Sequence, residues 1–237
     1  MKEFLSRFDK TLQRSLDLSG EVYVLIKECK LLLMEEFLGG PGPLGRRWPA
    51  VPLGELLASD GLVDGPAGNG LYGEARQEEA GAPGLPLITP ETIKDLRYRD
   101  NGLRLPEGTA EAHASLRVRG GDIVAASNGP LAGASALFPL FHTGGILGAG
   151  CLILRPDVSR CETFYLLNLL HYLYNCSAMK LYGGAARKLR EFSVPLPPLP
   201  EQKEISGRLL DLSAGMVAQE EYRREMNRLK ERISASS

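Results

Sequence analysis

The chain has 237 residues, with 28 lysines and arginines against 29 aspartates and glutamates, so its formal net charge is −1. This balance excludes a polybasic protein held to nucleic acid or to a membrane by bulk charge. Hydrophobic residues at 43% and charged residues at 24% are typical of a globular protein. No apolar run approaches the roughly 18 residues of a membrane span, and the first ten residues are too charged for a signal peptide, so we expect a cytoplasmic protein.

Residues 2–38 have the pattern of one long helix. Apolar side chains recur every three or four residues through this segment, which is the spacing of a single helix face. The Gly39–Gly40–Pro41 sequence ends the helix, and the glycine- and proline-rich residues 39–47 are expected to form a linker.

The middle of the chain, residues 48–195, has a mixed α and β pattern. We expect long surface loops over 58–86, a capped turn at Thr89–Thr92, and an irregular basic stretch after it. The remaining elements expected here are strands over 120–127, 134–141 and 146–156, a buried helix over 162–179, a loop over 181–189 and a short strand over 192–196.

A second long helix is predicted from Pro200 onward, because the prolines before it prevent an earlier start. Its apolar residues form two sets that are offset by six residues rather than seven, so the apolar stripe drifts and a perfect coiled coil is not expected. The sets are Ile205, Leu209, Leu212 and Met216, then Tyr222, Met226, Leu229 and Ile233. Residues 208–213 repeat residues 14–19 at five of six positions. Both helices are one-sided and too long to be stable alone, so they are expected to pack together or on a partner.

No sequence feature indicates catalysis, a metal or a cofactor. Phosphate-loop, serine-hydrolase and zinc-protease motifs are absent, and the glycines between 144 and 150 lie among apolar strand residues, which favours tight packing over phosphate binding. A serine nucleophile at Ser127 with His142 or His113 as base lacks a third orienting group. The three histidines and four cysteines are scattered without metal-ligand spacing, and the cysteines (Cys29, Cys151, Cys161 and Cys176) are expected to be buried core residues.

Two groups of residues resemble a known family. The first is Gly120-Gly121-Asp122-Ile123-Val124, followed by Ser127-Asn128-Gly129 and the later strand CLILRP; the second is FSVPLPPLPEQKEI at 192–205, which opens the last helix. Together they resemble the target-recognition domains of specificity subunits in type I restriction–modification systems. The match covers about 48–235.

The resemblance implies an α+β fold, with one mixed α/β target-recognition domain at 41–198 between two long helices at 1–40 and 199–237. The helices would pair as an antiparallel or dimeric coiled-coil-like unit that spaces and dimerises the domains. It also implies a non-catalytic subunit that binds double-stranded DNA and directs a DNA adenine methyltransferase subunit and a restriction subunit, binding no cofactor itself. Two copies would form a homodimer reading two half-sites.

Candidate DNA contacts are basic, aromatic or amide side chains in the expected loops. Arginine can bind guanine and asparagine can bind adenine through two hydrogen bonds. The candidates are Tyr72, Arg76, Lys94, Arg97, Arg99, Asn101, Arg104, Ser127, Asn128, Arg187 and Lys188. Residues 41–195 contain 15 basic and 15 acidic side chains, so phosphate binding would depend on a local cluster or on partner subunits. The alternative function is a helical assembly or decoy protein whose degenerate domain no longer reads DNA.

Overall fold

A computed structural model describes residues 2–39, 47–78, 83–94, 96–176 and 185–234. The chain divides into two compact units, one formed by residues 1–37 with 207–237 and the other by residues 38–206. Most of the expected linker, residues 40–46, lies outside the described residues. No helix in the described part of the chain is both long enough and apolar enough to cross a membrane.

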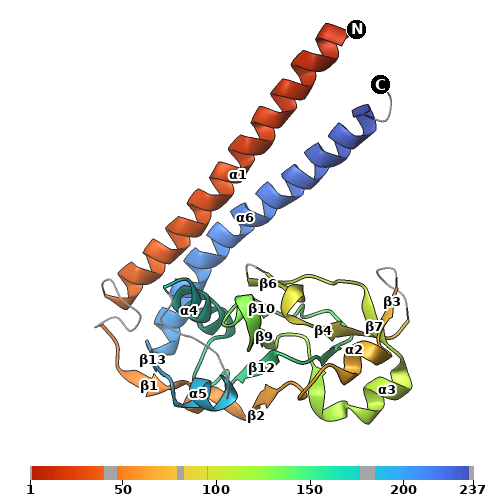
Figure 1. The fold of residues 1–237 in the computed structure, drawn as a ribbon. Helices are drawn as coiled ribbons and strands as arrows, with labels where there is room; N and C mark the ends of the chain where they lie inside the picture. The colour runs from red at the N-terminus through yellow and green to blue at the C-terminus, as the bar shows by residue number, and fades with distance from the viewer. Residues whose placement is uncertain (1, 40–46, 79–82, 95, 177–184, 235–237) are drawn as a thin grey trace. The chain divides into compact units, whose positions relative to one another are not determined.

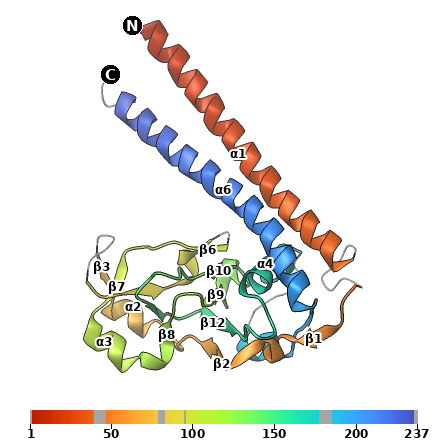
Figure 2. The ribbon, with the colours of Figure 1, turned by 180° about the vertical axis from the view of Figure 1, so that it is seen from behind.

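The helical unit consists of α1 (Lys2–Leu38) and most of α6 (Leu199–Ser234), which lie side by side in both ribbon views (Figures 1 and 2). The Ser19 hydroxyl donates to Gln219 Oε1 at 2.9 Å, and Lys30 Nζ donates to Ser213 Oγ at 2.7 Å. Because later residues of α1 contact earlier residues of α6, the two helices are antiparallel. This confirms the predicted helix pair and selects one of its two predicted arrangements.

The apolar seam of this pair does not continue along its whole length. Leu209 and Met216 of α6 are buried, whereas Tyr222 is 41% exposed and its hydroxyl meets Ser15 through a hydrogen bond of 2.5 Å. A polar groove of about 400 Å³ lies between the helices beside Gly20 and Arg223. The seam therefore becomes polar where the apolar stripe of α6 drifts, as its spacing predicts.

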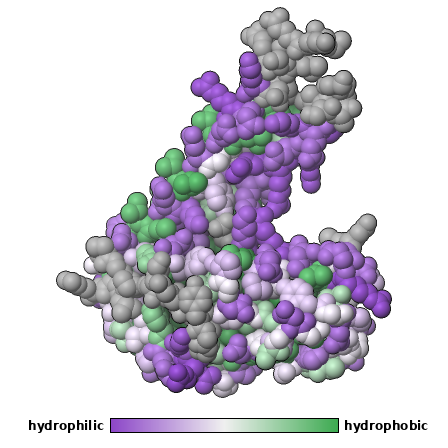
Figure 3. Space-filling model, viewed as in Figure 1, coloured by the Kyte–Doolittle hydropathy of each residue, from purple (hydrophilic) through white to green (hydrophobic). Residues whose placement is uncertain are grey.

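A second apolar stripe on α1 remains exposed. Its members are spaced four and three residues apart in alternation: Leu18 (53% exposed), Val22 (39%), Leu25 (58%), Cys29 (exposed) and Leu32 (64%). Figure 3 shows a row of hydrophobic side chains along this helix. Glu21 and Glu28, which are also exposed, border the stripe on one side. The spacing is that of a coiled-coil seam without its second helix.

The second unit contains two main sheets and a small ribbon. The ribbon pairs β1 (Ala50–Pro52) with β13 (Ser193–Pro195) in antiparallel fashion. The six-stranded sheet has the order β2 (Leu57–Asp64), β12 (Cys151–Pro156), β9 (Ile123–Ala126), β10 (Ser135–Leu137), β6 (Leu96–Tyr98) and β5 (Ile93–Lys94). The five-stranded sheet has the order β3 (Arg76–Gln77), β7 (Leu103–Leu105), β4 (Leu85–Ile88), β11 (Gly145–Leu147) and β8 (Arg117–Val118).

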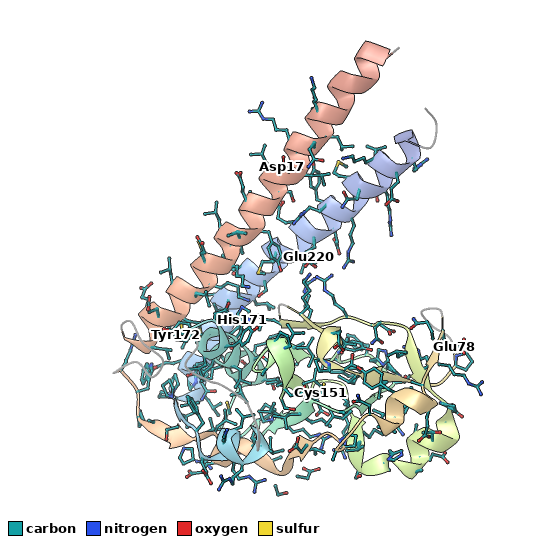
Figure 4. All side chains as sticks on the ribbon, viewed as in Figure 1. Asp17, Glu78, Cys151, His171, Tyr172 and Glu220 are labelled. Atoms are coloured by element: carbon teal, nitrogen blue, oxygen red, sulfur yellow. The ribbon has the colours of Figure 1, made fainter. Side chains whose placement is uncertain are left out.

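Side chains of the two sheets form one core cluster. It joins Val124, Ala136 and Ile153 of the six-stranded sheet to Ile88, Val118 and Leu147 of the five-stranded sheet, all fully buried. Helix α4 (Thr163–Asn175) packs on β10 and β6 and buries Tyr165 through Leu173, including the His171 and Tyr172 labelled in Figure 4. The short helices are α2 (Gly70–Glu74), α3 (Glu107–Ala112) and α5 (Ala185–Glu191).

Several local expectations were wrong. Residues 58–86 are not a series of loops, because they contain most of β2, all of α2 and β3, and the start of β4. The expected strand over 146–156 is two strands in different sheets, separated at Gly148–Gly150. At Gly148 an added Cβ would lie 2.6 Å from the Ile88 carbonyl oxygen, which confirms that these glycines serve tight packing. Cys151 and Cys161 are buried as expected, but Cys29 and Cys176 are exposed.

The PPLPEQ sequence opens α6, as predicted, and its glutamine has a structural role. Gln202 is fully buried; its Nε2 donates to the Pro197 oxygen at 2.8 Å and to the Arg160 oxygen at 3.1 Å. Its Oε1 accepts the Glu162 backbone N–H at 2.8 Å, and the Glu162 carboxylate in turn caps α4 and bonds to Ser206. One side-chain amide thus connects the start of α6 with the start of α4.

Replacing this amide is expected to destabilise the second unit. In Gln202→Leu the buried carbonyls of Pro197 and Arg160 and the N–H of Glu162 lose their partner, at a cost of about 3 kcal/mol in the free energy of unfolding. Lys203→Ala, at the exposed position next to it, is the control and should change stability by less than about 0.5 kcal/mol. Urea denaturation measures both, and equal midpoints for the two variants would contradict this role.

Candidate nucleic-acid interface

The basic stretch after the capped turn forms a hairpin instead of the expected irregular loop. Strands β5 and β6 pair in antiparallel fashion, which places Lys94 directly opposite Arg97. The backbone N–H of Arg99 donates to the Thr92 oxygen at 2.7 Å and continues this pairing beyond β6. Neighbouring basic side chains of this kind can hold one phosphate between them through charge-assisted hydrogen bonds. The hairpin therefore forms a small cationic edge on the six-stranded sheet.

The turn of this hairpin has an uncommon backbone conformation. Leu96 has a φ of +68°, which is rare for a residue with a bulky side chain, and it is the one non-glycine residue in the described segments with positive φ. Its side chain is only 9% exposed, and its backbone pairs with Ala136 of β10. Burial of Leu96 thus offsets a backbone strain of about 1–3 kcal/mol and holds the turn.

Arg104 and Asn101 have structural partners in this region. Arg104 is 5% exposed, and its guanidinium binds both carboxylate oxygens of Asp100, one of them at 2.7 Å. Hydrogen bonding from Arg104 lowers the pKa of the Asp100 carboxyl. The Asn101 side chain accepts the Leu103 backbone N–H at 3.0 Å and donates to Thr89 Oγ1 at 3.3 Å. Both side chains shape the turn between β6 and β7.

Tyr72 and Arg76 lie beside this region on α2 and β3. The Tyr72 hydroxyl donates to Glu91 at 3.3 Å, and burial raises the pKa of the Tyr72 hydroxyl. Arg76 is exposed and pairs across β3 and β7 with Arg104. Both arginines line an open depression of about 430 Å³ that also contains Glu78 and Glu107. Arg76 is therefore placed to reach an anion, with acidic side chains close by.

Ser127 and Asn128 form the turn that follows β9. The Ser127 backbone N–H donates to the Gly150 oxygen at 2.8 Å. Asn128 is exposed, and its side chain occupies the space that a Cβ on Gly150 would need, 2.4 Å from Asn128 Oδ1. Gly150, at φ +74°, is thus required by the turn on both steric and conformational grounds.

Arg187 and Lys188 lie on α5, not on the expected loop, of which residues 181–184 are outside the described residues. Both side chains are exposed. The next residue, Leu189, is buried and anchors the helix. Helix α5 packs on residues 53–56 and on β2, the strand at one edge of the six-stranded sheet. The hairpin with Lys94 and Arg97 is at the opposite edge, so the structure separates these two basic groups.

One exposed turn was not among the sequence candidates. Leu140 is 64% exposed and Phe141 fully exposed in the turn that follows β10. Because β10 runs parallel beside β6, this turn and Arg99 follow neighbouring strand ends. Two apolar residues between Pro139 and the Gly144–Gly145 pair are the signal in the sequence that indicates such a turn.

No metal centre is found in the segments described, where no group of three or more His, Cys, Asp or Glu side chains is arranged to hold an ion. His142 Nδ1 instead accepts the backbone N–H of Gly144 at 3.3 Å. The charged groups beside β8 are paired: Arg155 binds Asp122 at 2.9 Å and Asp60 at 3.6 Å. The arrangement offers cations and an exposed ring at a surface, which suits binding of an anionic polymer.

Comparisons with known proteins relate the chain to a family of DNA specificity domains. The family model described as "Type I restriction modification DNA specificity domain" matches residues 76–226. A curated relative, the putative type I restriction enzyme MjaX specificity subunit of Methanocaldococcus jannaschii, is 28% identical over 154 residues, covering 60% of this chain and 36% of that protein. The chain thus spans about a third of that relative's length.

Solved structures share the fold. The HsdS subunit from Thermoanaerobacter tengcongensis matches with a TM-score of 0.55 and 24% identity, over 97% of this chain and 56% of its own. The S subunit from M. genitalium matches with a TM-score of 0.59 and 15% identity, over 97% of this chain and 57% of its own. A third structure comes from a study of complex assembly and conformational transition of the type I restriction–modification system. It matches with a TM-score of 0.61 and 24% identity, over 98% of this chain and 56% of its own.

The family-model match extends over more than half of the chain and includes both the cationic hairpin and the PPLPEQ entry into α6. Members of this family are DNA-recognition subunits and not enzymes. The chain belongs to the family of type I restriction–modification DNA specificity domains.

Proposed function

We propose that this chain is a sequence-specific DNA-binding specificity subunit of a type I restriction–modification system. In this proposal it acts in the cytoplasm, binds no cofactor, and directs a DNA adenine methyltransferase subunit and a restriction subunit to a target in double-stranded DNA. The observation that carries the proposal is the β5–β6 hairpin, where Lys94 faces Arg97 with Arg99 beside them, inside a domain of this family.

The candidates differ in what they offer to DNA. Lys94, Arg97 and Arg99 come from one hairpin and are proposed as its phosphate and base contacts. Arg187 and Lys188 of α5, and Arg76 with Tyr72, are proposed as outlying contacts. The other four candidates are proposed to support DNA binding through the turns in which they lie; they are Asn101, Arg104, Ser127 and Asn128.

The exposed stripe on α1 supports the proposed partner. Leu18, Val22, Leu25, Cys29 and Leu32 have the spacing of a coiled-coil seam, and α6 does not cover them. Glu21 and Glu28 along its border favour a partner helix with basic flanking residues over a second copy of α1 packed on this same stripe. We propose that this stripe docks a helix of the methyltransferase subunit.

Two copies of the chain are proposed to pair through their long helices and to read two half-sites. The repeat of residues 14–19 at 208–213 supports this pairing, because it places a similar sequence on both long helices. Similar helix surfaces at both ends of one chain suit a symmetric assembly.

Removing the two hairpin arginines tests the DNA contact. Arg97→Ala with Arg99→Ala should weaken binding to duplexes selected from a randomised pool, and should reduce the slope of log K against log salt by about 0.9 per lost phosphate contact. Fluorescence anisotropy measures both quantities. Arg224→Ala with Arg228→Ala, two exposed arginines of α6, is the control. Selected binding that is absent in every salt condition, even with methyltransferase subunits present, would favour the decoy function.

The Asp100–Arg104 pair is expected to contribute stability that depends on pH. Arg104 lowers the pKa of Asp100 in the folded state, so the contribution is present above the unfolded pKa of about 3.9 and is lost as the pH falls through the folded pKa. Asp100→Asn should cost about 2 kcal/mol at pH 7, and the difference from the unaltered chain should shrink below about pH 4. Urea denaturation across this range measures it, with Glu74→Gln on α2 as control; a difference independent of pH would contradict the assignment.

Charged substitutions in the exposed stripe test the docking surface. Leu25→Glu with Leu32→Glu should abolish co-purification with the methyltransferase subunit while leaving the helix pair folded, because both side chains point away from α6. Val24→Glu replaces an equally exposed apolar residue outside the heptad positions and should have little effect. Sedimentation of the chain alone reports the pairing of two copies, and the mass of one chain under all conditions would contradict that pairing.

A further inference from the structure

The turn Pro139–His142 in the second unit exposes two large hydrophobic side chains next to each other. Phe141 is 102% exposed and Leu140 is 64% exposed; Val158 is the one other large hydrophobic residue exposed in that part of the structure. A phenylalanine ring in full contact with water gives nothing to the stability of the fold. An aromatic ring in this position is typical of a side chain that becomes buried against a partner.

This turn is held firmly in place. The His142 backbone N–H donates to the Pro139 oxygen at 3.1 Å, and the Gly121 N–H donates to the Phe138 oxygen at 3.0 Å. Phe138 is fully buried, and its ring lies 4.9 Å from each of the rings of Tyr98 and His142. Gly120 permits the close approach, since a Cβ there would lie 2.4 Å from the Leu140 oxygen.

A rigid base under an exposed side chain reduces the entropy that is lost when that side chain is bound. The Leu140–Phe141 tip is therefore a preorganised contact, since its turn is closed between Pro139 and His142 and is bonded through Phe138 to Gly121 and Asp122, just before β9.

In the described segments, arginines lie on both sides of the tip. On one side lies the hairpin of β5 and β6, whose Arg97 pairs in register with Leu137 of β10. On the other side is β8, whose Arg117 lies close to Gly144; its Nε would be 3.4 Å from a Cβ added to that glycine. The nearby carboxylates Asp100 and Asp122 each form an ion pair with an arginine, Arg104 and Arg155 respectively.

We propose that Leu140 and Phe141 form an apolar wedge that contacts the bases of bound duplex DNA, with the Phe141 ring stacked at a base step while the neighbouring cations hold the phosphates. The proposal rests on the proposed DNA-binding function and adds a contact that does not depend on charge. Duplex DNA is the partner that combines closely spaced anions with aromatic faces, and an inserted Phe or Leu side chain unstacks one step of it.

The wedge also bears on the neutral charge of the domain. With 15 basic and 15 acidic side chains over 41–195, phosphate attraction is limited to local clusters. Stacking on a base adds affinity that salt screens only weakly, and it is sensitive to how easily the chosen step deforms. Phe141 is therefore expected to lower the dissociation constant about tenfold and to contribute little to its salt dependence.

The experiment uses the full chain with its single tryptophan moved to the wedge. In Trp48→Phe with Phe141→Trp, the fluorescence of the indole at 141 should be quenched by duplexes selected from a randomised pool, because the ring stacks on a base. Trp48→Phe with Val24→Trp, which places the probe on the exposed face of α1, should not respond. Phe141→Ala should bind the same duplexes about tenfold more weakly with an unchanged salt slope and an unchanged circular dichroism spectrum.

The outcomes separate this inference from the function on which it rests. Unchanged affinity in Phe141→Ala together with an unquenched probe overturns the wedge and leaves DNA recognition standing. Absence of selected duplex binding in every variant overturns both. Quenching by vesicles of phosphatidylserine and phosphatidylcholine in place of DNA overturns the wedge in favour of a membrane contact. Loss of methyltransferase co-purification in Phe141→Ala, with no probe response to duplex, overturns it in favour of a protein contact.

Discussion

The buried amide of Gln202 is the interaction on which the arrangement of the second unit depends. Its three hydrogen bonds join the segment before α6, the segment before α4 and the cap of α4. Few side chains other than glutamine can donate twice and accept once at this position, since glutamate lacks the donors and lysine lacks the acceptor. The prolines in front of it give α6 a defined first turn, so the PPLPEQ sequence is a structural junction between sheet and helix and not a ligand-binding motif.

Two arginines of this domain have clear structural roles. Arg104 binds the Asp100 carboxylate and Arg155 binds the buried Asp122 carboxylate, so removing either acid would take away a close counter-charge. Lys94 and Arg97 instead face each other across β5 and β6, close to Arg99. Arg104 thus stabilises a turn, whereas the hairpin brings several basic side chains together on neighbouring strands. This difference selects the β5–β6 hairpin as the centre of the proposed DNA contact and leaves Arg104 as its support.

The periodic parts of the fold are those that the sequence predicts well. Helices α1, α4 and α6 have repeated apolar spacing, and the capped turn at Thr89 follows from side-chain chemistry. Strands β3, β5 and β6 have two or three residues, too few for any period to appear, and they acquire their structure from pairing with distant strands. The sequence pattern also does not show that Arg104 is buried while Arg99 is more exposed. Burial of Arg104 depends on its contact with Asp100 in the turn before β7. The exposure of Phe141 likewise depends on how β10 ends against Gly120.

Under the proposed function the chain has to bind DNA without holding every sequence equally, and its near-neutral net charge of −1 is consistent with that requirement. An excess of cations over the whole domain would strengthen binding to every sequence equally through the phosphates. In the proposed mode of binding, the basic side chains gathered on one hairpin and the exposed aromatic ring of Phe141 would make affinity depend on local geometry and on the base step that is contacted. The proposed docking stripe on α1 would extend the same principle to proteins, because Glu21 and Glu28 on its border would favour a partner helix with basic residues beside its apolar seam.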